Sequence, residues 1–266
     1  MKSDILSHLP PDHPWGNSIH WFDTIGSTNT HAKTLAAAGA PHGTVLIADN
    51  QTAGRGRMGR VFLSPPGSGI YMSVILRPNC PPTQLMHLTC AAALAACDVV
   101  AHTLNIHPGI KWINDLVCDG KKLAGILTEL SIDPKTALVD YAVIGIGINC
   151  NQRCEDFPPE LQTIACSAAM VSGLPIDRSR LAAALIMSFE KMSREIFTAQ
   201  RATMDRYRKD CVTIGAEVTV ICGEDRRSGT ALDITDDGAL LVAFADGHTE
   251  AVNSGEVSVR GLYGYT

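Results

Sequence analysis

Three arginines and three glycines occupy six of the seven positions from Gly54 to Arg60. Glycines allow the backbone to approach a ligand closely, and successive amide groups in such a loop can form an anion-binding concavity. Arginine side chains add planar, permanently charged groups that match the oxygens of phosphate and carboxylate. The whole chain carries a formal net charge of -5, so this cluster is not part of a general basic bias. We interpret it as an anion-binding loop rather than a solvated charge run.

A second group of polar residues lies at Lys111–Asp115, and a lysine pair follows at Lys121 and Lys122. The sequence Asp119-Gly120 between two apolar runs predicts a tight hairpin, which would bring Lys111 close to the lysine pair. A carboxylate and an amide beside cations suit phosphate carried with Mg²⁺. Together with the apolar strands around them, these groups predict a site that binds a polyanion beside an apolar ligand.

The elements that must position these groups follow a mixed α/β (α+β) pattern. We predict strands at residues 20–25, 44–49, 69–77, 110–118, 121–130 and 141–149, and helices at 28–38, 82–104, 178–197 and 200–210. Ser27 or Thr28 has the character of an N-cap, and Gly39 follows the predicted helix end. Capping alone would explain Ser27, Thr28 and Asn29 about as well as ligand binding does. From Gly215 onward, short β-branched runs alternate with turn signals, which predicts a small β-barrel.

These patterns predict two domains in a chain of 266 residues. We place a catalytic domain at residues 1–212, with 1–18 as a leader segment, and the small barrel at 213–266. No segment has the layout of a signal peptide, and no stretch approaches the uninterrupted apolar length of a membrane helix. The nine cysteines contain no C-x-x-C pair, so we expect reduced, mostly buried thiols in an intracellular protein.

Several common catalytic motifs are excluded. Gly145-x-Gly147 lacks the third glycine and the following helix of a dinucleotide-binding fingerprint. The chain has no P-loop, no G-x-S-x-G motif and no H-x-x-x-H pair. Any nucleotide must therefore be held without a P-loop, and the other two absences argue against a serine hydrolase and a catalytic zinc site.

Four segments together resemble the successive motifs of biotin protein ligases. They are Gly54–Arg60, Lys111–Leu116, Lys122–Leu127 and Gly145–Asn149, and they occur in the order and spacing of that family. One departure is Ile113, where the family usually has proline. Another is the lack of the N-terminal winged helix-turn-helix found in some members, because only about 20 residues precede the first predicted strand.

The resemblance implies a role for each matching residue. Biotin would contact Ser27, Thr28, Asn29, Gln51, Arg55, Gly56, Arg57, Lys122 and Gly125. ATP would contact Arg57, Arg60, Lys111, Asn114, Asp115 and Asn149, with Asp115 as a ligand of Mg²⁺. The catalytic residues would be Lys122, Arg57 and Lys111, and Lys122 rather than Lys121 matches the key lysine of the family.

The resemblance also implies the fold and the reaction. The expected fold is a mixed-sheet α/β catalytic domain followed by a small SH3-like barrel. Biotin and ATP would form biotinyl-5′-AMP, and a lysine of a biotin carboxyl carrier protein would then accept the biotin. We expect a cytoplasmic monomer or homodimer that has no DNA or membrane partner.

Three alternatives follow from the same residues. A lipoate ligase shares the expected fold and chemistry but accepts a different apolar acid, and the Arg/Gly loop favours biotin. A nucleic-acid-binding module would use the same loop, but such modules interleave aromatic residues and only Phe62 lies nearby. A ligand sensor that regulates transcription would need a DNA-reading element.

Overall fold

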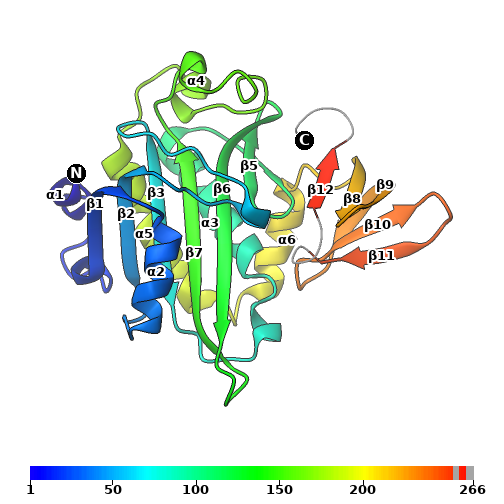
Figure 1. The fold of residues 1–266 in the computed structure, drawn as a ribbon, viewed down its shortest axis with the longest axis horizontal. Coiled ribbons are helices and arrows are strands. Elements are labelled where there is room, and N and C mark those ends of the chain that lie inside the picture. The colour runs from blue at the N-terminus through cyan, green and yellow to red at the C-terminus, as the bar shows by residue number, and fades with distance from the viewer. Residues whose placement is uncertain (254–257, 262–266) are drawn as a thin grey trace.

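Two β-sheets form the framework of the computed structural model, which describes residues 1–253 and 258–261 (Figure 1). The large sheet has the order β1-β2-β3-β7-β6-β5-β4, and the small sheet has the order β11-β10-β9-β8-β12. The strands of the large sheet are β1 Ile19–Ile25, β2 Thr44–Gln51, β3 Gly69–Leu76, β4 Gly109–Lys111, β5 Asp115–Cys118, β6 Lys121–Ile132 and β7 Val139–Asn149. Only the β1–β2 pair is parallel within this sheet, so the expected mixed sheet is confirmed.

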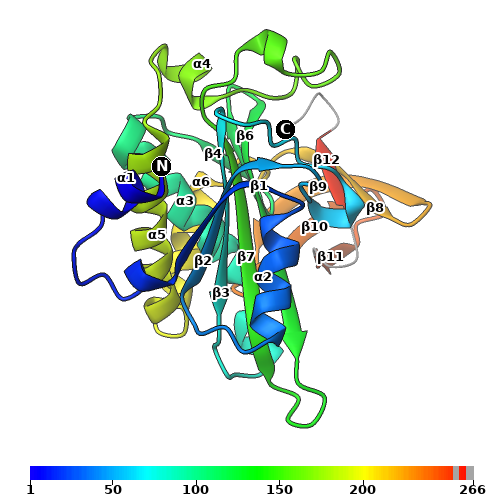
Figure 2. The same cartoon turned by 60° about the vertical axis from the view of Figure 1, so that its left-hand side comes forward.

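Helices cover both faces of the large sheet (Figure 2). The α-helices are α1 Lys2–Ser7, α2 Thr28–Ala37, α3 Leu88–Leu104, α4 Ala168–Ser172, α5 Arg178–Glu195 and α6 Gln200–Asp210, and the 3₁₀ turns are η1 Gly16–Ser18, η2 Arg57–Gly59, η3 Pro82–Leu85 and η4 Cys154–Asp156. Helix α2 packs alone against β2, β3 and β7, whereas α3 and α5 pack on each other and on the opposite face. The larger apolar cluster therefore lies on the α3 and α5 side.

The apolar segment at 82–104 differs from the expected single helix. Its first part is the 3₁₀ turn η3, and the α-helix begins only at Leu88. By length and composition, Pro82–Leu104 is apolar enough to cross a membrane, with a mean hydropathy of 1.5, which corrects the expectation that no stretch reaches this limit. Because 72% of its most apolar window is buried and α3 packs on α5 and β6, the segment is a core helix.

The predicted strand at 110–118 is two strands. Strands β4 and β5 pair with each other in antiparallel register, with Lys111 opposite Asp115, and the chain turns at Trp112–Asn114 between them. The Trp112–Ile113 peptide bond is cis. The Asp119-Gly120 hairpin is confirmed, because both residues have positive φ values of 48° and 71°, as a two-residue type I′ turn requires.

The small sheet contains the strands expected after residue 213. They are β8 Glu217–Cys222, β9 Asp225–Ile234, β10 Leu240–Phe244, β11 Thr249–Val252 and β12 Ser258–Gly261, and all neighbouring pairs are antiparallel. Residues 254–257 and 262–266 of the predicted barrel lie outside the described residues.

The N-terminal segment and most of the cysteines contribute to the core. Residues 1–18, expected as a leader, contribute Ile5, Leu9 and Trp15 to the buried core. All nine cysteines are free and seven are buried, which confirms the prediction of reduced, mostly buried thiols. Only Cys154 and Cys222 are exposed.

Candidate active site

Glycines at facing positions of β6 and β7 make room for a cavity on the α2 side of the large sheet. Gly125 pairs with Gly147, and Leu127 pairs with Gly145. A Cβ atom at Gly147 would lie 2.4 Å from the Phe62 ring, and one at Gly145 would lie 2.0 Å from Asn29 Oδ1. The missing side chains leave a cavity of about 600 Å³ between the sheet and the Arg/Gly loop, defined here as Gln51–Arg60.

One end of the cavity is a network of neutral polar side chains. The Thr28 amide N–H donates to Gln51 Oε1 at 2.8 Å, and Gln51 Nε2 donates to Ser64 Oγ at 2.9 Å. Ser73 Oγ lies 2.7 Å from Asn29 Oδ1 and 2.8 Å from Thr28 Oγ1. This neutral end therefore joins the start of α2 to β2 and β3 through short hydrogen bonds that are buried or partly buried.

Ser27 is the predicted cap of α2. It is the N-cap residue, and its side chain accepts a hydrogen bond from the Thr30 amide at 3.5 Å. Both Ser27 and Thr28 also line the cavity. Capping and ligand contact are compatible at this helix start, because each residue has more than one hydrogen-bonding group.

Glu129 on β6 joins three segments at the edge of the neutral end. Its carboxylate accepts hydrogen bonds from Asn29 Nδ2 at 3.1 Å and Lys33 Nζ at 2.8 Å, and Arg55 Nη1 lies 3.4 Å away. Partial burial opposes ionisation, but the hydrogen bonds from Lys33 and Asn29 prevail, so the pKa of Glu129 lies below its usual value. Arg55 of the Arg/Gly loop is thus linked to β6 and α2.

The other end of the cavity is cationic. Its lining includes Arg57, Arg60, Lys111 and Lys122. Lys122 Nζ lies 2.7 Å from Asp115 Oδ1, which places a carboxylate next to these cations. Like charges gathered in one concave site favour an anionic ligand.

Arg57 and Asn114 link the Arg/Gly loop to the turn between β4 and β5. Arg57 Nη1 donates to Asn114 Oδ1 at 3.1 Å, and Asn114 Nδ2 donates to the Ile126 carbonyl at 2.9 Å. Burial lowers the pKa of the Arg57 guanidinium, while Asp115 opposes that shift. An arginine remains charged despite such a shift, so Arg57 presents a partly desolvated cation to the cavity.

The two neighbouring lysines of β6 point in different directions. Lys122 lines the cavity, and its Nζ lies 5.9 Å from the centre of the Phe62 ring. Lys121 donates to the Gln162 carbonyl at 3.5 Å and does not line the cavity. This alternation is the normal behaviour of successive strand residues.

Asn149 at the end of β7 is held by the segment that follows it. Its Nδ2 donates to the Cys166 carbonyl at 3.0 Å, and its Oδ1 accepts from Gln152 Nε2 at 3.3 Å. Phe157 and Ile164 from the same segment form an apolar part of the cavity wall beside Asn149.

Thirteen of the fourteen site residues expected from the sequence line this cavity. The exception is Asp115, whose carboxylate lies beneath the lining: a Cβ at Gly125 would be 3.4 Å from its Oδ1. Two residues that contact the site, Ser73 and Glu129, were not predicted from the sequence, and neither was the role of Gly145 and Gly147 in opening the cavity. Glycines two apart inside an apolar strand were the available signal, because strand glycines often mark a close approach.

The fold and the cavity define a class of protein: an α/β domain with a ligand cavity that joins a neutral hydrogen-bonding end to a cationic end. Comparisons with known proteins agree with this class. A model of the biotin/lipoate A/B protein ligase family matches residues 21–149, and a model of the biotin protein ligase C terminal domain matches residues 213–260.

Individual relatives give the same result. The bifunctional ligase/repressor BirA of Bacillus spizizenii is 40% identical over 236 residues, covering 87% of this chain and 71% of the relative. The biotin--[acetyl-CoA-carboxylase] ligase of Mycobacterium tuberculosis is 36% identical over 238 residues, which cover 87% of this chain and 85% of the relative. The structure of a biotin protein ligase from Aquifex aeolicus in complex with biotin and ATP matches with a TM-score of 0.78 at 28% identity. The match covers 92% of this chain and 99% of the Aquifex aeolicus chain. The chain belongs to the biotin protein ligases, a family of enzymes.

Proposed function

We propose that this ligase activates biotin with ATP to form biotinyl-5′-AMP, and then transfers biotin to a lysine of a biotin carboxyl carrier protein. The observation that carries the proposal is the meeting of Arg57, Lys111 and Lys122 in one cavity with a neutral polar end. Two anions must meet in the first step, and cations placed between them offset their repulsion. The similar Aquifex aeolicus structure contains biotin and ATP.

The two ends of the cavity divide the substrates. We assign the ureido ring of biotin to the neutral end, where Ser27, Thr28, Asn29 and Gln51 supply donors and acceptors. Gly56 and Gly125 allow the backbone to approach biotin closely. The triphosphate occupies the cationic end, with Arg57, Arg60, Lys111 and Asn114 around it, and Asn149 faces the adenine.

Adenylation follows from this placement. A carboxylate oxygen of biotin attacks the α-phosphorus of ATP, a new O–P bond forms, and the bond to pyrophosphate breaks. Lys122 and Arg57 are positioned to hold the carboxylate and the charge that develops on the α-phosphate. Lys122 is held by Asp115 at 2.7 Å in the structure, so its ammonium group is already directed near the cavity floor.

Transfer uses the same bound intermediate. The neutral amine of the acceptor lysine attacks the acyl carbon of biotinyl-5′-AMP, the acyl C–O bond breaks, and AMP leaves with the electron pair. The amine loses its proton as the amide forms. Because the intermediate is a mixed anhydride, water must be kept away until the acceptor arrives.

The Arg/Gly loop and the residues after it are suited to cover the intermediate. Met58 and Val61 are apolar yet 60% and 74% exposed beside the cavity. Burial of such side chains on closure would favour the covered state. We propose that this segment closes over biotinyl-5′-AMP.

We propose that Mg²⁺ enters as a complex with ATP. The described residues contain no cluster of three or more His, Cys, Asp or Glu side chains that could hold a metal alone. A single carboxylate together with phosphate oxygens is a normal Mg²⁺ environment, and in this proposal Asp115 would supply the carboxylate. When bound, Mg²⁺ would neutralise phosphate charge.

Other assignments extend the proposal to the whole chain. We propose a catalytic domain of residues 1–212 and a small C-terminal domain of 213–266, because the second sheet and its family match begin near residue 213. Nine free thiols suit a reducing compartment, and we propose the cytoplasm. A monomer or homodimer would serve the acceptor protein equally well.

The decisive experiment mixes the protein with biotin, Mg²⁺ and ATP and measures biotinyl-5′-AMP and pyrophosphate. We expect both products, and a carrier domain added afterwards should become biotinylated. Isothermal titration with biotin and with lipoic acid separates the two ligase classes. Tighter binding of lipoic acid, or no adenylate with biotin, would overturn the proposal.

A further inference from the structure

We infer that Trp112 is a positioning residue for the ATP half of the cavity, and that the C-terminal sheet holds it in place. The inference rests on the proposed function, because it concerns how Lys111 and Asn114 are held for the triphosphate. It assigns the small sheet a role in catalysis that does not require its own residues to touch a substrate.

The turn between β4 and β5 is held by groups outside the large sheet. Trp112 is 4% exposed, and its indole N–H donates to the Gly238 carbonyl at 2.9 Å. The Trp112 amide donates to Thr213 Oγ1 at 2.9 Å, and the Ile113 carbonyl accepts from the Tyr207 hydroxyl at 3.1 Å. These three contacts come from α6, from the connection after it and from the small sheet.

Gly238 belongs to the turn between β9 and β10, which is well ordered by its own hydrogen bonds. The Gly238 amide donates to the Thr235 carbonyl at 2.9 Å, and the Ala239 amide donates to Thr235 Oγ1 at 3.1 Å. Gly238 has φ of 87°, and a Cβ there would lie 3.0 Å from Cys90 Sγ. A larger residue would be strained at this position, so the carbonyl that receives the indole depends on glycine.

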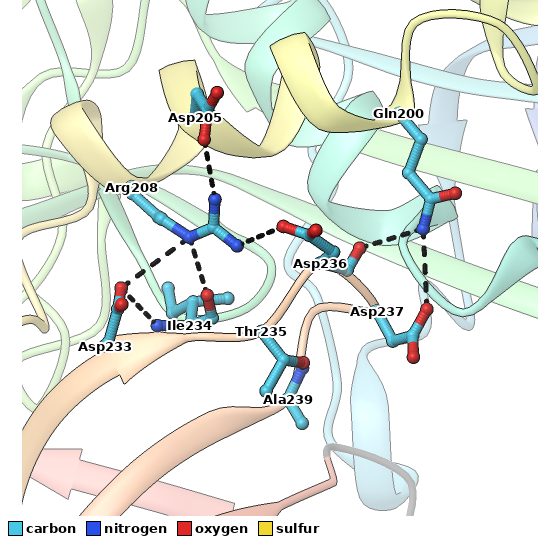
Figure 3. Close-up of polar contacts among 9 residues, drawn as sticks. All are labelled: Gln200, Asp205, Arg208, Asp233, Ile234, Thr235, Asp236, Asp237 and Ala239. Atoms are coloured by element: carbon cyan, nitrogen blue, oxygen red, sulfur yellow. Dashed lines mark hydrogen bonds and ion pairs between the residues drawn. The ribbon is translucent and has the colours of Figure 1, made fainter.

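Arg208 fixes the same turn to α6 (Figure 3). Its Nε donates to the Ile234 carbonyl at 2.6 Å, and its other nitrogens contact the carboxylates of Asp236 and Asp205. Gln200 adds a bond from Nε2 to the Asp236 carbonyl at 3.0 Å. The Arg208 side chain is 21% exposed, and several partners share its planar donors, which makes this junction stronger than an isolated surface ion pair.

Helix α6 therefore connects two turns through neighbouring residues. Tyr207 contacts the turn at Ile113, and Arg208 contacts the turn at Ile234 and Asp236. Lys111 precedes Trp112 directly and Asn114 follows it by two positions, and both line the cavity. A shift of the indole would move both of these groups. The neutral end would not move with them, because its residues lie on α2, β2 and β3.

The first test is Trp112→Phe, which removes the indole N–H and keeps an aromatic ring. We expect about a tenfold rise in the KM for ATP in the pyrophosphate exchange assay, the fold-change typical of one buried hydrogen bond. The KM for biotin should stay within about twofold, because the perturbation is local. Trp21→Phe is the matched control: it removes an exposed indole bond to Asp23 (2.9 Å) and should leave both constants unchanged.

The second test uses two arginines of α6. Arg208→Met should raise the KM for ATP in the same direction as Trp112→Phe, and Arg208→Lys should restore part of the loss. Arg206→Met is the control, because Arg206 pairs with Asp98 of α3 at the surface and not with a residue of either turn. A selective rise in the KM for ATP in both test variants supports the inference.

The outcomes separate the two proposals. If the wild-type protein forms biotinyl-5′-AMP but the variants keep a normal KM for ATP, the positioning role is overturned and the proposed function stands. An equal rise in the KM for ATP and for biotin also overturns it, since that pattern indicates general loss of structure. If the wild-type protein forms no adenylate, both proposals fail.

Discussion

The neutral and cationic ends of one cavity are built in different ways. At the neutral end, Thr28 and Asn29 of α2 bond to Gln51 of β2 and Ser73 of β3, and α2 packs on the sheet that contains both strands. The cationic end takes Arg57 and Arg60 from the Arg/Gly loop, and Lys111 and Lys122 from the ends of β4 and β6. One end is thus set by the core of the fold, and the other depends on a loop and on strand ends that meet it.

This difference indicates what each end contributes to the reaction. A preformed hydrogen-bonding pocket binds the ground state and the transition state about equally, so it mainly sets affinity. Cations near the reacting atoms act most strongly on charge that develops in the transition state, so they mainly set rate. The cationic groups are linked to Asn114 and Asp115 in the structure, and an anionic ligand would exchange these partners for its own oxygens.

The largest effect is expected for Lys122→Ala at the cationic end. Loss of the charged group proposed to hold the reacting carboxylate should lower adenylate formation roughly a hundredfold or more. Lys121→Ala is the control and should stay within about twofold, because Lys121 contacts the Gln162 carbonyl outside the cavity. The rate of pyrophosphate release measures adenylate formation in both variants. Equal losses in the two variants would refute the distinction between the lysines.

Arg57→Gly should have the next largest effect. It removes a partly buried cation that joins the Arg/Gly loop to Asn114 at 3.1 Å, so biotinyl-5′-AMP should dissociate roughly ten- to a hundredfold faster. Lys135→Gly in the exposed turn between β6 and β7 loses a cation away from the cavity and serves as the control. Unchanged retention of the adenylate in Arg57→Gly would show that this arginine does not hold the intermediate.

Gly145→Ala tests the neutral end. The added Cβ would lie 2.0 Å from Asn29 Oδ1, so Asn29 must move. Biotin affinity, measured by titration calorimetry, should weaken about tenfold while the KM for ATP changes little. Gly16→Ala has nothing within 4 Å of the new Cβ and should bind biotin normally. A change in the KM for ATP without a change in biotin affinity would reverse the assignment of the two ends.

Glu129→Gln should have the smallest effect, and it depends on pH. Burial works against the charged carboxylate, but bonds from Lys33 and Asn29 leave the folded pKa below the reference value of 4.5. The ionised group therefore stabilises the folded protein above that value, and this contribution disappears as pH falls through the folded pKa. The difference in Tm between wild type and variant should be present at pH 7 and shrink below pH 4.5. A difference that stays constant with pH would contradict this prediction.

Local signals predicted much of the structure. Ser27 caps α2 and Asp119-Gly120 forms the hairpin, because caps and two-residue turns depend on neighbouring residues. The start of α3 was misplaced because Pro82 suits the first turn of an α-helix and no further proline or glycine interrupts the chain before Leu88. The predicted strand at 110–118 did not show the break between β4 and β5. That break depends on the antiparallel pairing of Lys111 with Asp115, which the local sequence does not reveal.

The amino-acid sequence by itself determined the order of the elements, the motifs and thirteen of the residues that line the cavity. Tertiary structure alone decided which groups meet across long sequence distances. Glu129 binds Lys33 and Arg55, and Trp112 binds Gly238, through sheet order and helix packing. The physical reason is that local conformation depends on neighbours in the chain, whereas a binding site forms where packing brings separate segments within bonding distance.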